Sequence, residues 1–152
     1  MSIVYIGIGS NIGNRQENCR EAIRQMGRRG VNVVKESSMI ETEPWGVTEQ
    51  PRFINMAVEA ETGLAPENLF TALKDTEAAM GRTDAVRWGP RVIDLDIFFY
   101  DDMVLDTPEL KIPHPYLHER DFVLIPLAEI APEKIHPVFK KSVRELCIDQ
   151  SA

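Results

Sequence analysis

The segment Val92-Ile93-Asp94-Leu95-Asp96-Ile97-Phe98-Phe99-Tyr100 carries the clearest strand pattern in the chain. It is short and rich in β-branched and aromatic residues, which is typical of a buried strand. Because side chains alternate across a strand, Asp94 and Asp96 share one face, and the apolar residues beside them share the other. The segment therefore predicts a strand with one apolar face and one acidic face.

The segments before this strand alternate between strand and helix patterns. Strands are expected at 3–8, 31–38 and 53–61, and helices at 15–28 and 66–80. The order β-α-β-β-α-β resembles a split βαβ, ferredoxin-like core. We therefore predict an α+β fold, an α-β-α sandwich with a mostly antiparallel central sheet, formed as a single domain over residues 1–152.

The remaining segments are less regular. Residues 39–52 contain Pro and Gly and are interpreted as a loop, and residues 105–115 as irregular chain. Short helices are expected at 120–130 and 142–148.

Composition and charge limit the class of protein. The 152 residues are 43% hydrophobic and 27% charged, as in a globular protein. The net charge of −7 disfavours nucleic acid as a partner. The N-terminus shows neither a signal peptide nor a membrane span, so we expect a cytoplasmic protein without a membrane partner. The helical spacing of Cys19 predicts a small buried residue rather than half of a disulfide.

The two acids of the first segment are candidate metal ligands. Residues i and i+2 of a strand lie roughly 6.5–7 Å apart, and two carboxylates this close repel each other in apolar surroundings. A divalent cation removes that repulsion, and oxygen ligands suit Mg²⁺, which also binds phosphate. The alternative is a solvated strand face with two surface acids.

The preceding stretch, 81–91, concentrates positive charge in an acidic chain. It contains Arg82, Arg87 and Arg91, and arginine matches phosphate oxygens with two parallel hydrogen bonds. The alternative is simple pairing of these arginines with neighbouring aspartates. Trp88 fits either a site residue or a core anchor.

These segments together resemble a known family. Residues 87–97 look like the signature of the 6-hydroxymethyl-7,8-dihydropterin pyrophosphokinase family. Supporting similarity spans about residues 3–132 and is carried by the segments 5–11, 42–46, 50–55, 112–115 and 120–127. The resemblance implies an ATP-dependent diphosphotransferase of folate biosynthesis, which moves diphosphate from ATP to the hydroxymethyl group of the pterin and releases AMP.

The resemblance also implies roles for residues that bind ATP. Asp94 and Asp96 would hold two Mg²⁺ ions. Arg82 and Arg91 would bind the phosphates, with Trp88 ordering as its loop closes. His114 and Arg120 would contact ATP. A monomer is the family expectation.

A second group of residues is implied for the pterin. Asn55 would hydrogen-bond the pterin edge, Phe53 and Phe122 would sandwich its ring, and Thr42 and Trp45 would line the pocket. Each has a structural alternative, as a core, strand or loop residue. Glu77 matches an acid of the family. Its helical spacing turns it toward the apolar side of its helix, which suits a partnered carboxylate.

The chain departs from the family pattern at two places. The stretch between Arg82 and Trp88 is one residue shorter than in the well-known bacterial pattern, and Asp84 lies where a second basic residue is common. Pro115 follows His114 where some members have an aromatic residue, and the role of Tyr116 stays open.

Two other functions remain as alternatives. Glycines at 7, 9 and 13 follow a strand and precede a helix, as in a dinucleotide-binding domain, although their spacing is not that of the Rossmann fingerprint. A ferredoxin-like regulatory module is the other alternative, because fold alone does not decide function. Such a module would bind Mg-ATP without forming AMP.

Overall fold

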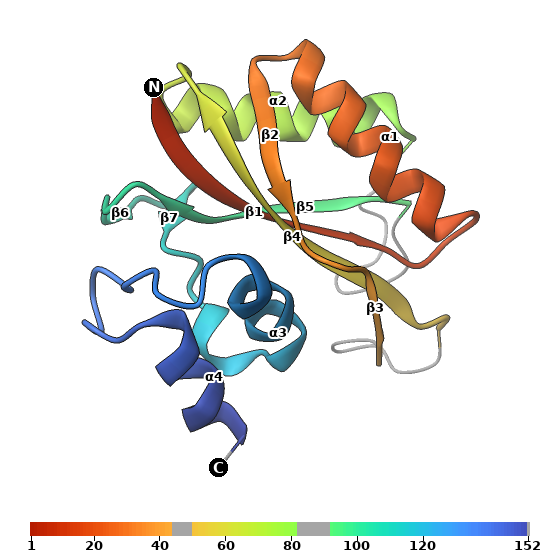
Figure 1. Cartoon of the computed structure of the whole chain (residues 1–152). Coiled ribbons are helices and arrows are strands. Elements are labelled where there is room, and N and C mark those ends of the chain that lie inside the picture. Colours follow the sequence, from red (N-terminus) through yellow and green to blue (C-terminus); the bar gives the residue numbers. More distant parts are fainter. Residues whose placement is uncertain (44–49, 82–91, 152) are drawn as a thin grey trace.

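A central antiparallel sheet organises the chain (Figure 1). The computed structural model describes residues 1–43, 50–81 and 92–151. Within them, four strands run in the order β2-β4-β1-β5, and β3 also pairs with β4. The strands are β1 (Ser2–Ser10), β2 (Val31–Glu36), β3 (Ile40–Thr42), β4 (Phe53–Thr62) and β5 (Asp94–Tyr100). A separate two-stranded ribbon joins β6 (Leu105–Asp106) to β7 (Lys111–Ile112).

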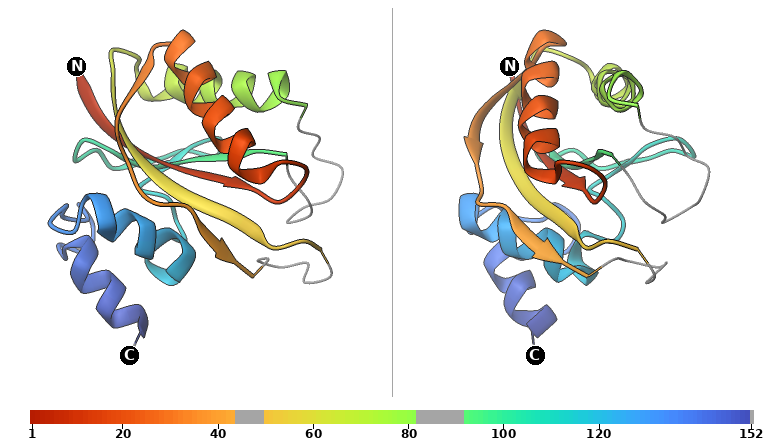
Figure 2. Two further views of the ribbon diagram at one scale, coloured as in Figure 1. Left: turned by 45° about the vertical axis from the view of Figure 1, so that its right-hand side comes forward. Right: turned by 90° about the vertical axis from the view of Figure 1, so that its right-hand side faces the viewer.

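Helices cover both faces of the sheet, as the two views of Figure 2 show. One face carries α1 (Arg15–Arg28) and α2 (Pro66–Ala79). The other carries α3 (Asp121–Ile130) and α4 (Val143–Ser151), preceded by a 3₁₀ turn, η1 (Leu117–Glu119). The predicted α-β-α sandwich with an antiparallel sheet is confirmed.

Local sequence explains the two helices of the first face. The Asn14 side chain accepts a hydrogen bond from the Glu17 backbone N–H at 3.2 Å and so caps the start of α1. Proline occupies the first turn of α2, where its missing N–H removes no helical hydrogen bond. Both helices end before glycines with positive φ, Gly30 at 89° and Gly81 at 86°.

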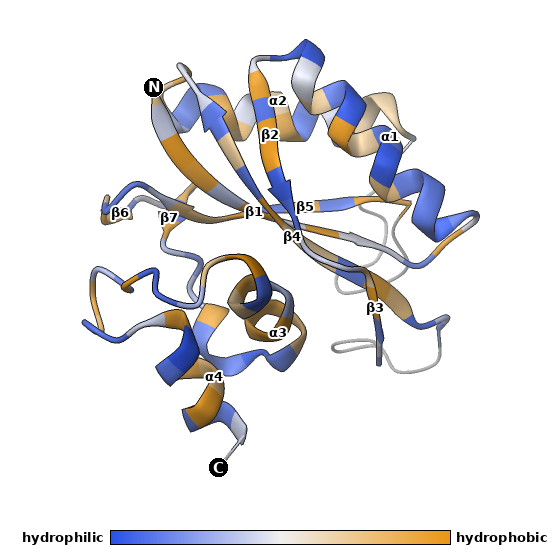
Figure 3. Cartoon of the chain, in the orientation of Figure 1, coloured by the Kyte–Doolittle hydropathy of each residue, from blue (hydrophilic) through white to orange (hydrophobic). Residues whose placement is uncertain are grey.

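Apolar side chains on the inner sides of these helices form one core with the sheet. Cys19, Ala22 and Met26 of α1 are fully buried, so the prediction for Cys19 is confirmed. The remaining surface of α1 is mostly hydrophilic (Figure 3). A second core lies on the opposite face, where Phe99 of β5 and Leu124 of α3 are fully buried. The sheet is therefore packed on both faces, and β5 is held between the two cores.

Two irregular segments contain short strands that the sequence did not predict. Residues 39–52 were expected to be a loop, but Ile40–Thr42 pairs with β4 and sets Thr42 opposite Phe53. Residues 105–115 contain β6 and β7. Strands of two or three residues are too short to show an alternation pattern, which explains both differences.

The antiparallel sheet also bears on the alternative functions. A dinucleotide-binding domain requires a parallel, doubly wound sheet, whereas β1 pairs antiparallel with both β4 and β5. That alternative is excluded. In the described part of the chain, no helix has both the length and the apolarity needed to span a membrane.

A buried histidine in the segment between α3 and α4 is expected to make the stability of the protein depend on pH. His136 is 4% exposed, and its Nδ1 accepts hydrogen bonds from the backbone N–H groups of Val138 (3.1 Å) and Phe139 (3.2 Å). Burial, and secondarily the charge of His118, lower the pKa of His136 from 6.5 to about 4. The unfolded chain therefore takes up this proton below pH 6.5, while the native state takes it up only near pH 4.

We expect the free energy of unfolding to decrease by about 2 kcal/mol through this group between pH 7 and pH 5. Above pH 6.5 the neutral His136 makes its full contribution to the free energy of unfolding. Urea titrations of wild type and His136→Asn at both pH values measure it, because asparagine keeps an acceptor but does not titrate there. An equal pH dependence in the two proteins would contradict the prediction.

Candidate active site

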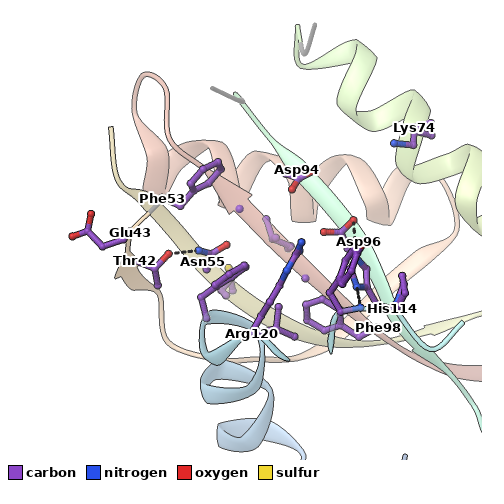
Figure 4. Close-up of a pocket in the computed structure, with 18 residues that line it drawn as sticks. Thr42, Glu43, Phe53, Asn55, Lys74, Asp94, Asp96, Phe98, His114 and Arg120 are labelled. Atoms are coloured by element: carbon purple, nitrogen blue, oxygen red, sulfur yellow. Dashed lines mark hydrogen bonds and ion pairs between the residues drawn. The ribbon is translucent and has the colours of Figure 1, made fainter. Parts of the chain in front are cut away.

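A cleft of about 250 Å³ opens over one end of strands β1, β4 and β5 (Figure 4). It brings together eight of the side chains predicted from the sequence, namely Thr42, Phe53, Asn55, Asp94, Asp96, His114, Arg120 and Phe122. The other four, Trp45, Arg82, Trp88 and Arg91, lie outside the described residues, as does Asp84. Residues as far apart in sequence as Thr42 and Phe122 thus line one cavity.

The two aspartates lie on the same side of β5 and line the cleft, as predicted. Asp94 pairs with Gly9 of β1 and Asp96 with Gly7. The Asp96 side chain is 38% exposed, and its carboxylate faces the cleft near other acidic side chains. Desolvation, followed by the charges of Asp94 and Glu77, raises the pKa of Asp96 to about 8. The ionised form of Asp96 is therefore disfavoured without a cation, and a bound cation would favour it.

Glu77 connects α2 to this strand. The residue is 3% exposed, and its Oε2 accepts a hydrogen bond at 2.8 Å from the backbone N–H of Leu95, between the two aspartates. Its Oε1 lies 3.3 Å from the Lys74 ammonium. Because β5 is at the edge of the sheet, this carboxylate satisfies a strand N–H that no neighbouring strand reaches. The expectation of a partnered carboxylate at Glu77 is confirmed.

His114 lies beside Asp96 as a neutral imidazole. Burial, and then the charge of Arg120, lower the pKa of His114 to about 4. Its Nδ1 accepts a hydrogen bond from the Tyr116 backbone N–H at 3.2 Å, so Nε2 carries the proton. Nε2 lies 3.9 Å from the Asp96 carboxylate. His114 therefore presents a hydrogen-bond donor at the edge of the acidic pair.

Arg120 brings a positive charge into the cleft from the start of α3. The residue is 5% exposed, and its guanidinium lies 4.9 Å from the centre of the Tyr116 ring and 5.5 Å from that of Phe122. In Figure 4 its tip lies between Asn55 and Asp96. Burial lowers the pKa of Arg120, and Asp96 and Asp94 oppose that shift, so the group stays charged.

The other half of the cleft is aromatic and hydrogen-bonding. The Asn55 amide donates to the Thr42 hydroxyl at 2.6 Å, because the pairing of β3 with β4 sets these strands side by side. Phe53 and Phe122 both line the cleft and are partly buried. This half suits a flat ring with polar edges.

The cleft is also lined by Gly7, Gly9 and Phe98, of which the sequence patterns marked the two glycines only as a possible dinucleotide-binding motif. A Cβ at Gly9 would lie 2.8 Å from the Asn55 Oδ1, and a Cβ at Gly7 only 2.1 Å from the Phe98 ring. The Phe98 ring in turn meets His114 edge-on, with centroids 6.3 Å apart. Glycine within a strand often marks such a close approach, and this is the signal that could have found them.

A second pocket of about 230 Å³ runs along the outer edge of β5. Its walls come from Phe70 and Leu73 of α2, from β5 itself and from the segment 108–111. Within the described residues it shares Lys74, Asp96, His114 and Pro115 with the first cleft. The two cavities therefore meet at Asp96, an arrangement that suits two ligands reacting with each other.

The donor set at this junction fits magnesium. Among residues 1–43, 50–81 and 92–151, no three His, Cys, Asp or Glu side chains form a complete metal cage. Mg²⁺ commonly takes only one or two carboxylates and obtains its other ligands from phosphate and water. Two adjacent carboxylates facing a cavity match that preference.

Comparison with known proteins identifies the family. Residues 5–132 match the profile of 7,8-dihydro-6-hydroxymethylpterin-pyrophosphokinase. The 2-amino-4-hydroxy-6-hydroxymethyldihydropteridine pyrophosphokinase of Aquifex aeolicus is 41% identical over 145 residues, which cover 95% of this chain and 90% of that protein. The mitochondrial folate synthesis bifunctional protein of Arabidopsis thaliana is 51% identical over 127 residues, which cover 84% of this chain but 23% of that protein.

Solved structures show the same fold. Wild-type Plasmodium falciparum HPPK-DHPS superimposes with a TM-score of 0.74 at 15% identity, covering 97% of this chain and 44% of that one. At this identity the likeness concerns the fold alone, while the family match and the Aquifex relative span most of the sequence. The chain therefore belongs to the 7,8-dihydro-6-hydroxymethylpterin-pyrophosphokinase family.

Proposed function

We propose that the chain transfers diphosphate from ATP to the hydroxymethyl group of 6-hydroxymethyl-7,8-dihydropterin and releases AMP, as a step of folate biosynthesis. The observation that carries this proposal is the meeting of two cavities at Asp96, with Asp94 beside it in the first cleft. The family assignment and the pyrophosphokinase activity named for the Aquifex relative support it. We expect one domain over residues 1–152, acting as a cytoplasmic monomer.

The pterin is assigned to the first cleft. The Asn55 amide, held by its hydrogen bond to Thr42, would bind the polar edge of the ring, and Phe53 and Phe122 would contact its faces. Trp45 is predicted to complete this pocket. The flat shape of the ligand and its polar edge are the features that this half of the cleft can recognise.

ATP is assigned to the second pocket, with its phosphates at the junction. The apolar walls from Phe70 and Leu73 suit a nucleoside, and His114 presents its Nε2–H beside Asp96. Arg120 supplies positive charge from the opposite wall. Arg82, Trp88 and Arg91 are predicted to join the phosphate site.

Asp94 and Asp96 would hold two Mg²⁺ ions. Bound magnesium neutralises phosphate oxygens and lowers the pKa of a bound hydroxyl group. The protein itself contributes position, since phosphoryl transfer depends mostly on alignment and charge stabilisation. The hydrogen bond from Leu95 to Glu77 fixes β5 between the two aspartates for this purpose.

The reaction predicts a distinctive product. The hydroxymethyl oxygen attacks the β-phosphorus and loses its proton, and the bond from that phosphorus to the oxygen bridging toward the α-phosphorus breaks. The β- and γ-phosphates then leave together on the pterin, and AMP is released. Simple phosphate transfer would instead release ADP.

The test supplies purified protein with Mg²⁺, the hydroxymethyl dihydropterin and ATP labelled at the γ-phosphate. We expect the label on the pterin together with an equal amount of AMP, and no AMP above background from Asp94→Ala. A regulatory module would bind Mg-ATP without forming AMP. Production of ADP, or no pterin-dependent AMP, would contradict the proposal.

A further inference from the structure

Lys74 lies where the two cavities meet. It extends from α2 and lines both the first cleft and the second pocket. In Figure 4 its side chain lies on α2, the helix that contacts β5. Among the described residues, both cavities also share Asp96, His114 and Pro115, so in this part of the chain Lys74 is the shared residue with a cationic side chain.

The acidic side chains around the junction favour a cationic side chain on the side of α2. Three acids gather there, Asp94, Asp96 and Glu77. Arg120 approaches from the side of α3, and Lys74 approaches from α2 on the other side of β5. A polyphosphate chain lying across the junction therefore has Lys74 available on its nucleoside side.

The present contacts of Lys74 allow it to move onto a ligand. Its ammonium lies 3.3 Å from Glu77, and its side chain is 46% exposed. The ammonium also lies 5.4 Å from the centre of the Phe70 ring, in the wall of the second pocket. Glu77, whose side chain is 4% exposed, keeps its hydrogen bond from Leu95 when the lysine turns toward a ligand.

We propose that Lys74 is a phosphate-binding residue for the nucleotide, which it holds at the entrance from the second pocket into the first. The proposal rests on the proposed function and adds a specific ligand contact to it. A lysine ammonium binds phosphate as a point charge, without the fixed geometry that arginine requires. It can therefore follow the phosphates while the magnesium-binding carboxylates stay fixed on β5.

The first test measures binding without the reaction. Calorimetric titration of a non-hydrolysable Mg-ATP analogue, without pterin, is carried out on wild type, Lys74→Ala and Lys74→Arg. We expect about a tenfold weaker Kd for Lys74→Ala, equivalent to ~1.4 kcal/mol, and a Kd close to wild type for Lys74→Arg. The difference between wild type and Lys74→Ala should shrink as salt is raised, because it is electrostatic.

Lys141→Ala is the matched control. Lys141 is 48% exposed, much like Lys74, and its ammonium lies 2.7 Å from Asp149 of α4, so Lys141→Ala also removes a lysine ion pair, at a place that lines neither cavity. Its Kd should equal that of wild type. An unchanged Kd in Lys74→Ala, or equal weakening in both alanine variants, would overturn the proposal.

Steady-state kinetics separates a binding role from a structural one. Lys74→Ala should raise the KM for ATP about tenfold and change the KM for the pterin less than about twofold. A variant that merely weakened α2 would lower the melting temperature and leave both KM values alone, which would overturn the assignment. If wild type binds the analogue through Lys74 but forms no AMP, the phosphate contact stands and the proposed function fails.

Discussion

Asp96→Ala is expected to lower kcat by about 10³-fold at saturating ATP, pterin and Mg²⁺, which corresponds to ~4 kcal/mol of transition-state stabilisation. The aspartate lies at the junction of both cavities, so its loss removes a metal ligand at the place where the phosphate must react. Measurement of AMP formation over a range of magnesium concentrations tests this directly.

The loss of activity should not come from unfolding. Removing one of three neighbouring acids relieves repulsion, so the melting temperature of Asp96→Ala without metal should equal or exceed that of wild type. Asp149→Ala serves as the control, because it removes an exposed acid on α4 and should keep full turnover. Turnover in Asp96→Ala equal to that of the control would remove Asp96 from the metal site.

Gly7→Ala is expected to destabilise the protein by about 1–3 kcal/mol, the usual range for overpacking. The added methyl group would lie 2.1 Å from the Phe98 ring, far inside van der Waals contact. Phe98 is almost fully buried and meets His114 edge-on, so the ring can move only by disturbing the cleft. Denaturant titration measures the loss, and the KM for the pterin should rise with it.

A smaller residue at 98 should relieve the clash. The double variant Gly7→Ala/Phe98→Leu is expected to be more stable than the sum of its single variants predicts, by about 1 kcal/mol or more. Gly27→Ala provides the opposite control, because a Cβ there meets no atom within 4 Å and alanine favours a helix. It should stabilise the protein by about 0.5–1 kcal/mol. Additive effects at 7 and 98 would contradict direct contact between them.

The regular elements could be predicted because their patterns are local. The alternation in residues 92–100 predicted β5 and the shared face of Asp94 and Asp96, and the helical spacing of Cys19 predicted the buried side of α1. The partnered state of Glu77 followed from its place on the apolar side of α2. In each case the relevant neighbours lie within one element or follow from its periodicity.

The second pocket could not be predicted in the same way. Its walls come from α2, β5 and the segment 108–111, and only the folded sheet brings them together. From the sequence alone, Lys74 would be interpreted as an ordinary exposed lysine of a helix. The fit of Phe98 against Gly7 likewise depends on the register between β5 and β1, which no local pattern specifies.

A crystal structure with Mg²⁺, a non-hydrolysable ATP analogue and the pterin tests the central claim most directly. We predict magnesium about 2.0–2.1 Å from carboxylate oxygens of both Asp94 and Asp96, with phosphate oxygens among its other ligands. The nucleoside should occupy the pocket along β5 and the pterin the cleft beside Asn55. Nucleotide and metal bound elsewhere, with both carboxylates facing only water, would contradict the account.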